Sequence, residues 1–401
     1  MRRRWWTVLG FCAAAQGLAY GAETPGAARF IAVPVNATGA GNARVASECI
    51  VPAGPPIPVT ALAFHPDNHT LASAGHHEIL LWDLSLARLT RRIGPLPGRV
   101  RGLAFHPNGE LLAIAEGTPG SGGAVRVFEF ASPQPGAPLL ETKDEMFAVA
   151  FSPDGRWLAA GGADAQVRVW SVEDRKLAAT FGGRSGWITG VAFSPDGAFL
   201  ASSSADRTTE IRETSKWDVL STVPRPLTDP ANAVAFSPDN EWLAFAIGGV
   251  DERTVRFWRT ASVKESTPAP GSSVRPRDTT RITRPADVGP GMPLALAWIP
   301  AATGAPARPA RVFAGGTGNY IRVITATGAF VANLTGHQDW VYSLAATRDG
   351  MRLASGCGDG TVKIWNTADN SLLATLIQTK PQSDEWVIVT PRSFHRHPRR
   401  R

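Results

Sequence analysis

The chain has 401 residues, a length that suits one large domain or two ordinary ones. Glycine (40) and proline (32) are abundant and charged residues make up only 19%, a composition typical of many short strands joined by tight turns. The net charge of +7 is concentrated at the ends, because three arginines lie in residues 1–22 and five in residues 392–401. The body between them is close to neutral and cannot attract phosphates over a broad surface, so a nucleic-acid partner is not expected.

Residues 1–22 have the layout of a secretory signal peptide. Residues 2–4 are arginines, residues 7–20 are mostly apolar, and small residues end the segment at Gly21 and Ala22. The apolar run is shorter than the ~20 residues that span a bilayer, so we expect cleavage, with retention as a membrane anchor as the alternative. The sequence therefore predicts an exported protein, periplasmic or extracellular, with no membrane span after cleavage.

Residues 23–56 form a lead between the predicted signal and the first repeat. The lead contains Cys49, and Cys357 is the only other cysteine that remains after cleavage. Because one possible pair is not a disulfide framework, we expect two unpaired thiols. The lead could also supply a strand that closes the fold against the last repeat, although residues 371–376 could fill the same place.

From residue 57 to residue 378 one pattern recurs seven times. An apolar strand runs into Pro-Asp-Gly or a close variant and then into a second apolar strand, as around Pro153-Asp-Gly155. Proline presets the second position of a type I turn, and glycine takes the left-handed position that closes the hairpin. Seven copies about forty residues apart are typical of a β-propeller. The anchor residues of the copies are Phe64, Phe105, Phe151, Phe193, Phe236, Trp298 and Ala346.

A third strand with alternating apolar and basic residues follows, as in Val167-Arg-Val-Trp170 and Val362-Lys-Ile-Trp365. Such alternation predicts that the apolar side chains pack between sheets while the basic ones meet solvent. A fourth short strand completes most copies, for example at residues 176–181. The sequence therefore predicts an all-β fold, a seven-bladed β-propeller with four strands in each blade.

These copies resemble the WD-repeat family, and Trp82-Asp83 is the literal pair of residues that names it. By its predicted signal the chain is similar to exported bacterial members of that family. The resemblance implies a structural set in each repeat, made of a histidine, a strand serine, a turn aspartate and a tryptophan that are hydrogen bonded together, and only the seventh copy has the histidine after a glycine. The residues in these roles are His337, Ser355, Asp359 and Trp365 in the seventh copy, Asp164 and Asp206 in the third and fourth, and Trp82, Trp170 and Trp258 in the first, third and fifth.

Some copies depart from the pattern. Arg212 stands where the fourth copy should have tryptophan, and Ile324 stands there in the sixth, so we expect blades four and six to be the least regular. Residues 259–293 interrupt the regular spacing of the repeats and are rich in proline, serine, threonine and arginine. Such a composition cannot bury a core and predicts a loop insert.

Residues 379–401 follow the last repeat. The apolar segment Glu385 to Pro391 is expected to form an extra strand beyond the ring. The basic run of residues 392–401 is expected to be a solvated tail, with an anchor on an anionic surface as the alternative.

Partner binding is expected on the narrow face of the propeller, which WD-repeat proteins commonly use. Side chains just before or at the start of a first strand should reach this face, and exposed aromatic and arginine residues are the usual anchors of interfaces. The two tryptophans among them could instead cap the inner strands. The candidate partner-binding residues are Arg99, Arg101, Met146, Trp187 and Trp340.

Motifs for other chemistry were sought and none was found. The sequence contains no Gly-x-x-x-x-Gly-Lys-Ser/Thr loop, Gly-x-Ser-x-Gly elbow, His-Glu-x-x-His helix or Cys-x-x-Cys-His haem motif. His76-His77-Glu78 looks ligand-like but has no complementary ligands, so a solvated turn is expected. We therefore predict no catalytic, metal or cofactor site.

The predicted function is a non-catalytic scaffold that binds a protein or peptide. The alternative is a propeller enzyme, or a sugar- or metal-binding protein, with its site in the central channel. That alternative would need polar groups from several blades at the inner ends of the first strands, which are instead poor in acids, histidine and cysteine. The sequence gives no oligomeric state.

Overall fold

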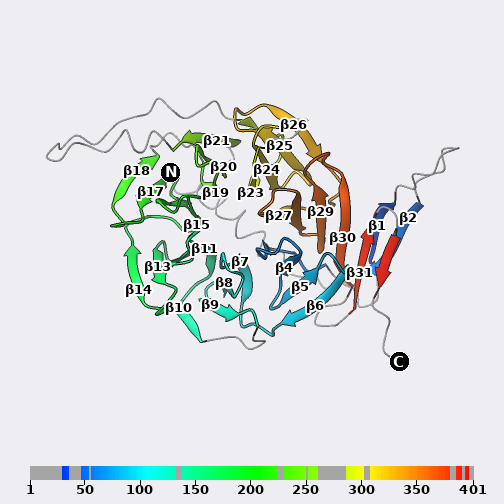
Figure 1. Ribbon diagram of the computed structural model, residues 1–401, viewed down its shortest axis with the longest axis horizontal. Coiled ribbons are helices and arrows are strands. Elements are labelled where there is room, and N and C mark those ends of the chain that lie inside the picture. The colour runs from blue at the N-terminus through cyan, green and yellow to red at the C-terminus, as the bar shows by residue number, and fades with distance from the viewer. Residues whose placement is uncertain are drawn as a thin grey trace.

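Seven antiparallel sheets stand around a central axis in the computed structural model, and the predicted seven-bladed β-propeller is confirmed (Figure 1). The structure describes residues 29–35, 47–53, 56–131, 137–223, 229–249, 252–260, 286–301, 308–379, 385–390 and 393–396. The predicted signal at residues 1–22 and most of the predicted insert therefore lie outside the described residues. Within the described part of the chain, no helix is long and apolar enough to cross a membrane.

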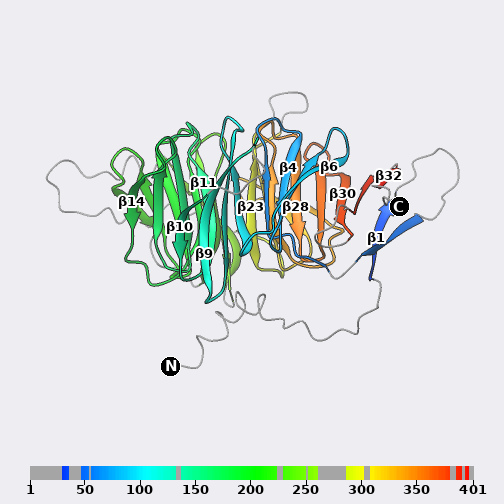
Figure 2. The ribbon, with the colours of Figure 1, turned by 90° about the horizontal axis from the view of Figure 1, so that it is seen from below.

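Each blade follows the chain outward from the axis. The first strand of every blade lies innermost and contacts the first strand of the next blade (Figure 1). Seen from the side, the strands run from one face of the ring to the other (Figure 2). Blade one contains β3 (Ala61–Phe64), β4 (Thr70–Ala74), β5 (Ile79–Asp83) and β6 (Arg88–Ile93), and blade two contains β7 (Arg99–Phe105), β8 (Leu111–Thr118), β9 (Gly122–Glu129) and β10 (Pro138–Thr142).

Blades three to seven repeat the same order. Blade three contains β11 (Met146–Phe151), β12 (Trp157–Gly162), β13 (Val167–Ser171) and β14 (Leu177–Phe181), and blade four contains β15 (Ile188–Phe193), β16 (Phe199–Ser204), β17 (Thr209–Glu213) and β18 (Val219–Val223). Blade five contains β19 (Ala231–Phe236), β20 (Trp242–Gly248), β21 (Arg253–Arg259) and β22 (Ala286–Asp287). Blade six contains β23 (Pro293–Ile299), β24 (Arg311–Gly316), β25 (Ile321–Thr325) and β26 (Phe330–Leu334), and blade seven begins with β27 (Val341–Ala346), β28 (Arg352–Cys357), β29 (Thr361–Asn366) and β30 (Leu372–Gln378).

The prediction that blades four and six would be the least regular is wrong. Both have four full strands, whereas the fourth strand of blade five, β22, has two residues. Arg212 fills the tryptophan position of blade four, because its guanidinium lies 4.1 Å from the centre of the Phe181 ring and donates to the Trp217 carbonyl oxygen at 2.9 Å. Ile324 is buried in the core between blades five and six. Other side chains can therefore occupy this position without loss of a strand.

The hydrophobic core is divided among the spaces between blades. The described residues form seven clusters, and each cluster draws its members from two neighbouring blades. A fully buried leucine, isoleucine or phenylalanine contributes about 1.5–3 kcal/mol relative to an exposed one. An exposed ion pair contributes ~0–1 kcal/mol, so apolar burial between blades dominates the stability of the ring.

In blades two, three, five and seven the basic residue of the third strand does not face solvent, which corrects the prediction for these blades. The side chains of Arg126, Arg168 and Arg256 are 15%, 15% and 17% exposed. Each pairs with an acid of the second strand or the following turn in its own blade, at 2.6 Å from Glu116, 2.5 Å from Asp164 and 2.7 Å from Glu252 respectively. Lys363 is buried and donates to Thr375 Oγ1 at 3.2 Å. Both faces of a blade meet a neighbouring blade, so the basic side chains of the polar face are held by acids or a hydroxyl group within the fold.

The ring closes between blade seven and blade one without exchange of a strand. The amide of Val59 donates to the carbonyl oxygen of Cys357 at 3.0 Å, and the amide of Arg348 donates to Asn68 Oδ1 at 2.8 Å. The fourth strand of blade seven is β30, which contains most of residues 371–376. In the lead, β1 (Arg29–Val35) and β2 (Ser47–Ala53) pair with each other in a separate sheet outside the ring (Figures 1 and 2).

Blade seven continues beyond the ring as a six-stranded sheet. β31 (Trp386–Thr390), within the segment expected to form an extra strand, pairs with β30, and β32 (Ser393–Arg396) pairs with β31. The ring centres of Trp386 and Trp82 of blade one lie 6.3 Å apart in an edge-to-face contact. Trp386 and Ile388 thereby join the apolar cluster that spans the closure.

We expect Trp386→Ala to lower the free energy of unfolding by about 3–5 kcal/mol, because it empties a buried position at the closure of the ring. The measurement is urea unfolding followed by circular dichroism. Leu373→Ala is the matched control, since Leu373 lies on neighbouring β30 but is 37% exposed and should change stability little. Equal, small effects of the two substitutions would show that β31 does not stabilise the closure.

Candidate functional site

The structural set of blade seven is a buried hydrogen-bond network. Ser355 Oγ lies 2.7 Å from His337 Nε2 and accepts from Trp365 Nε1 at 2.8 Å. Asp359 accepts from the amide of Gln338 at 3.0 Å and from the amide of Thr361 at 2.9 Å. The network ties the loop before β27 to the turn between β28 and β29, and so it fixes the loops at this end of the blade.

Burial and hydrogen bonding set the charges of this network. Burial lowers the pKa of His337 below its ordinary value, and the neighbouring Asp359 only partly opposes that shift. Burial would raise the pKa of Asp359, but hydrogen bonds from His337, from the Gln338 amide and from the Thr361 hydroxyl hold that pKa below its usual value. The pair is therefore a neutral imidazole beside a carboxylate.

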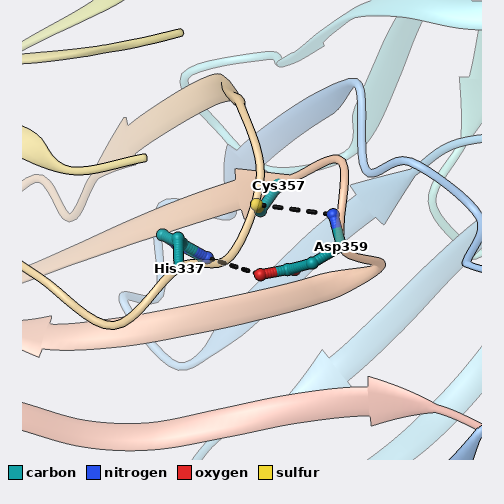
Figure 3. Close-up of side chains that lie close together, drawn as sticks. All are labelled: His337, Cys357 and Asp359. Carbon is teal, nitrogen blue, oxygen red and sulfur yellow. Dashed lines mark hydrogen bonds and ion pairs between the residues drawn. The ribbon is translucent and has the colours of Figure 1, made fainter. Parts of the chain in front are cut away.

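His337, Cys357 and Asp359 bring three possible metal-ligand atoms within 4.8 Å of one another (Figure 3). The Cys357 thiol donates to the Asp339 carbonyl oxygen at 3.2 Å and accepts from the Asp359 amide at 3.4 Å. Burial also raises the pKa of Cys357, whereas a metal ligand must be a thiolate. These contacts support a structural role. Cys357 is a free thiol, and the side chain of Cys49 lies outside the described residues.

The turn aspartates of the other blades bond to the backbone. Asp164 accepts from the amide of Gln166 at 3.2 Å, and Asp206 accepts from the amide of Thr208 at 3.0 Å. Asp83 accepts in the same way from the amides of Ser85 and Leu86. The tryptophans Trp82, Trp170 and Trp258 are buried, and Trp82 Nε1 donates to Ser73 Oγ at 2.8 Å, as Trp365 does to Ser355.

Arg184 takes the place of the histidine in blade four. Its guanidinium donates to Ser202 Oγ at 3.0 Å and lies 3.2 Å from Glu210 Oε1 and 3.9 Å from Asp206 Oδ1. The side chain is only 6% exposed. The sequence analysis missed this residue, although Gly183-Arg184 precedes Trp187 by the same spacing as Gly336-His337 precedes Trp340. Blade four therefore contains a charged form of the network.

The turn at His76-His77-Glu78 is only partly solvated. His76 is exposed, but Glu78 is buried and accepts from Gln378 Nε2 of blade seven at 2.9 Å. Arg92 Nε lies 3.4 Å from the same carboxylate. The expectation of a solvated turn is therefore wrong for Glu78, because the neighbouring blade covers it.

The loops before the first strands form one face of the ring, which we name the rim face (residues 94–98, 143–145, 182–187, 288–292 and 335–340). In blades two to seven the first strand has a bulge near its start. At this bulge one residue of the first strand has no register partner on the second strand. Several of these residues contact the next blade, as Thr189 Oγ1 does at the Ala231 carbonyl oxygen, at 2.6 Å. The bulge residues are Arg101, Phe147, Thr189, Asn232, Leu294 and Tyr342.

Four of the five predicted partner-binding residues are half-buried, two of them on the rim face and two beside it at the start of β7. Trp187 lies against Phe147, with ring centres 5.6 Å apart, and Trp340 lies against Tyr342 at 6.1 Å. Arg101 Nε lies 3.5 Å from Glu145 Oε1 of the next blade. The four residues are Arg99, Arg101, Trp187 and Trp340.

Met146 does not reach the surface, which corrects its prediction. Its side chain is fully buried in the core between blades two and three. Met146 precedes the bulge of its strand, in register with Ile188 and Val341, which are equally buried. Glu145, one residue earlier, holds the position that Trp187 and Trp340 hold in their blades.

Comparison with known proteins finds the same repeat. A family model described as "WD domain, G-beta repeat" matches residues 53–83, 139–171, 175–211, 218–259 and 328–366. "Pre-mRNA-processing factor 19" of Bos taurus is 28% identical over 137 residues, 33% of this chain and 26% of that protein. "WD repeat-containing protein VIP3" of Arabidopsis thaliana is 31% identical over 133 residues, 30% of this chain and 40% of that protein.

A third relative carries a name that refers to an assembly. "Target of rapamycin complex subunit LST8" of Mus musculus is 27% identical over 115 residues, 28% of this chain and 33% of that protein. The chain thus spans between about a quarter and two fifths of the length of these curated relatives.

We expect Arg184→Ala to destabilise the protein by about 3 kcal/mol, because it removes the buried cation beside Asp206 and leaves Glu210 with Arg212 alone. Urea unfolding measures the change. Lys176→Ala is the control, since its pair with Asp174 is 81% and 44% exposed and should contribute less than about 1 kcal/mol. Matching values for the two substitutions would refute a network role for Arg184.

Proposed function

Because the chain is a seven-bladed β-propeller of WD40 repeats, we propose that it is a non-catalytic interaction module that binds a protein or peptide on the rim face. The observation that carries the proposal is the pair of half-exposed aromatic contacts there, Trp187 with Phe147 and Trp340 with Tyr342. Large aromatic residues dominate the binding energy of most interfaces. The name of the mouse relative, a complex subunit, agrees with this class of function.

The structure of the ring supports recognition by a preformed surface. Some of the bulge residues that follow the rim loops are held by the next blade, as Asn232 is by the Pro293 carbonyl oxygen at 3.0 Å. The rim loop of blade seven is fixed from below by the His337 network. A surface already ordered before binding loses little conformational entropy when a partner arrives.

We expect the double substitution Trp187→Ala and Trp340→Ala to weaken partner binding by about thirtyfold or more, the loss typical of a hot spot. The measurement is capture of partners from extract by the immobilised chain, followed by titration of the purified partner. Phe330→Ala is the control, because Phe330 is 56% exposed on the outer strand β26, away from the rim. Unchanged affinity of the double variant, with unfolding also unchanged, would reject the rim face.

We also propose that the protein acts in the bacterial envelope or outside the cell, on the strength of the composition of residues 1–22. Expression of the full chain in a bacterial host should give a periplasmic product that begins near Glu23, as measured by intact mass. Leu9→Arg is the control, since a charge in the apolar segment should block export. A full-length product confined to the cytoplasm would contradict the proposal.

A further inference from the structure

A cavity of about 240 Å³ lies at the closure of the ring, between blade seven and blade one. Its walls include the buried apolar side chains of Leu80, Trp82, Val362 and Leu376. His76, Gln338 and Asp339 also line it and are exposed, so it can be reached from solvent beside the rim face. Sites for drug-sized ligands measure about 300–1,000 Å³, so this volume suits a single side chain.

The cavity has a counterpart in other blades, where it is filled. Ser73 and Trp82 of blade one repeat the bond between Ser355 and Trp365, and both line the cavity. In blade seven the space beside the serine is occupied by His337 from the loop before the first strand. The corresponding segment of blade one reads Gly54-Pro-Pro-Ile-Pro58 and offers no such side chain.

Blade four shows which chemistry this space accepts. There the guanidinium of Arg184 enters from the loop before the first strand and donates to Ser202, which matches Ser73 in register. Two acids of the adjoining turn and strand, Asp206 and Glu210, neutralise it. The fold therefore already holds one arginine in this position, nearly buried and fully paired.

The charges around the empty space in blade one are also negative. The acids that line it are Glu78, Asp339 and Asp359, and its lining contains no lysine or arginine. Glu78 is buried and is already paired with Arg92 outside the lining, and Asp359 already accepts from two backbone amides. The exposed carboxylate of Asp339 and the remaining negative charge of Asp359 therefore favour a further cation. Partial desolvation, the adjacent His77 and the nearby Arg99 lower the pKa of His76, so that ring adds no positive charge at neutral pH.

From these observations we propose that the cavity receives a lysine or arginine side chain of the bound partner, in the place that Arg184 occupies in blade four. The aliphatic part of such a side chain would lie against Trp82 and Leu376, and its charged head would lie near Asp339, Asp359 and the Ser73 hydroxyl. This inference rests on the proposed function, because the cavity opens beside the rim face.

The direct test is titration calorimetry of the full chain with three small probes. They are Nα-acetyl-L-arginine methylamide, its lysine counterpart and its citrulline counterpart, which has the shape of arginine but no charge. We expect the two basic probes to bind at least tenfold more tightly than citrulline, with an affinity that falls as salt is added. Equal binding of the arginine and citrulline probes would overturn the proposal.

Variants locate the binding. Asp339→Asn should weaken the arginine probe about fivefold, and Gln378→Lys should abolish its binding, because the new ammonium can reach Glu78 and fill the cavity from within. Glu129→Gln is the matched control, since that carboxylate is 67% exposed in blade two. Urea unfolding checks that each variant folds. Unchanged binding in folded Gln378→Lys would place the probe elsewhere and overturn the assignment.

Two further arms separate this inference from its alternatives. Removal of residues 392–401 should leave probe binding unchanged. A stronger affinity would show that the chain's own arginines compete for the cavity, and it would overturn the proposal that the basic side chain comes from a partner. Full-strength partner binding by Gln378→Lys would reject the cavity while the rim face still stands. If the rim-face double variant loses partner binding but still binds the probe, the rim face and the cavity are supported as separate sites.

Discussion

Burial of apolar faces between neighbouring blades is the interaction on which the whole structure depends. Every core cluster among the described residues belongs to two blades, so a blade does not enclose a core of its own. Each blade then needs a neighbour on both sides, and the ring must close. The closure between blades seven and one is held mainly by side chains, with Trp386 of β31 packed on Trp82. The strands added after the seventh repeat thus contribute to the same requirement.

One position of the repeat shows how the space between blades accommodates different chemistry. A neutral histidine fills it in blade seven and an arginine with two acids fills it in blade four, and both reach a serine of the second strand. The histidine needs little compensation because burial keeps it uncharged. The arginine keeps its charge and needs Asp206 and Glu210 beside it. Where neither side chain is present, as in blade one, a polar cavity remains.

The rim face is held rigidly by the sheets and presents partly exposed aromatic side chains. Its tryptophans lie directly before the first strands, and the bulges that follow them are fixed to the next blade. The side chains that could contact a partner are therefore positioned by seven sheets and depend little on the loops themselves. This arrangement is suited to recognition.

The sequence by itself determined the number of blades, the order of strands and the roles of the turn aspartates. These features depend on local signals, because Pro-Asp-Gly turns and alternating strands act within a few residues. It also located the network of His337, Ser355, Asp359 and Trp365, through a motif within one repeat.

Only the tertiary structure decided which side chains are buried and where a cavity lies. Alternation marks two faces of a strand but does not say that both meet another blade. Arg126 and Lys363 were therefore expected in solvent, whereas Arg126 is paired with Glu116 and Lys363 is buried. The strand pairing also decided that Met146 lies in register with the buried Ile188 and Val341, which puts Glu145 in the position of Trp187. The cavity joins Glu78 to Gln378, residues 300 positions apart, because closure of the ring brings the two ends of the repeat array together.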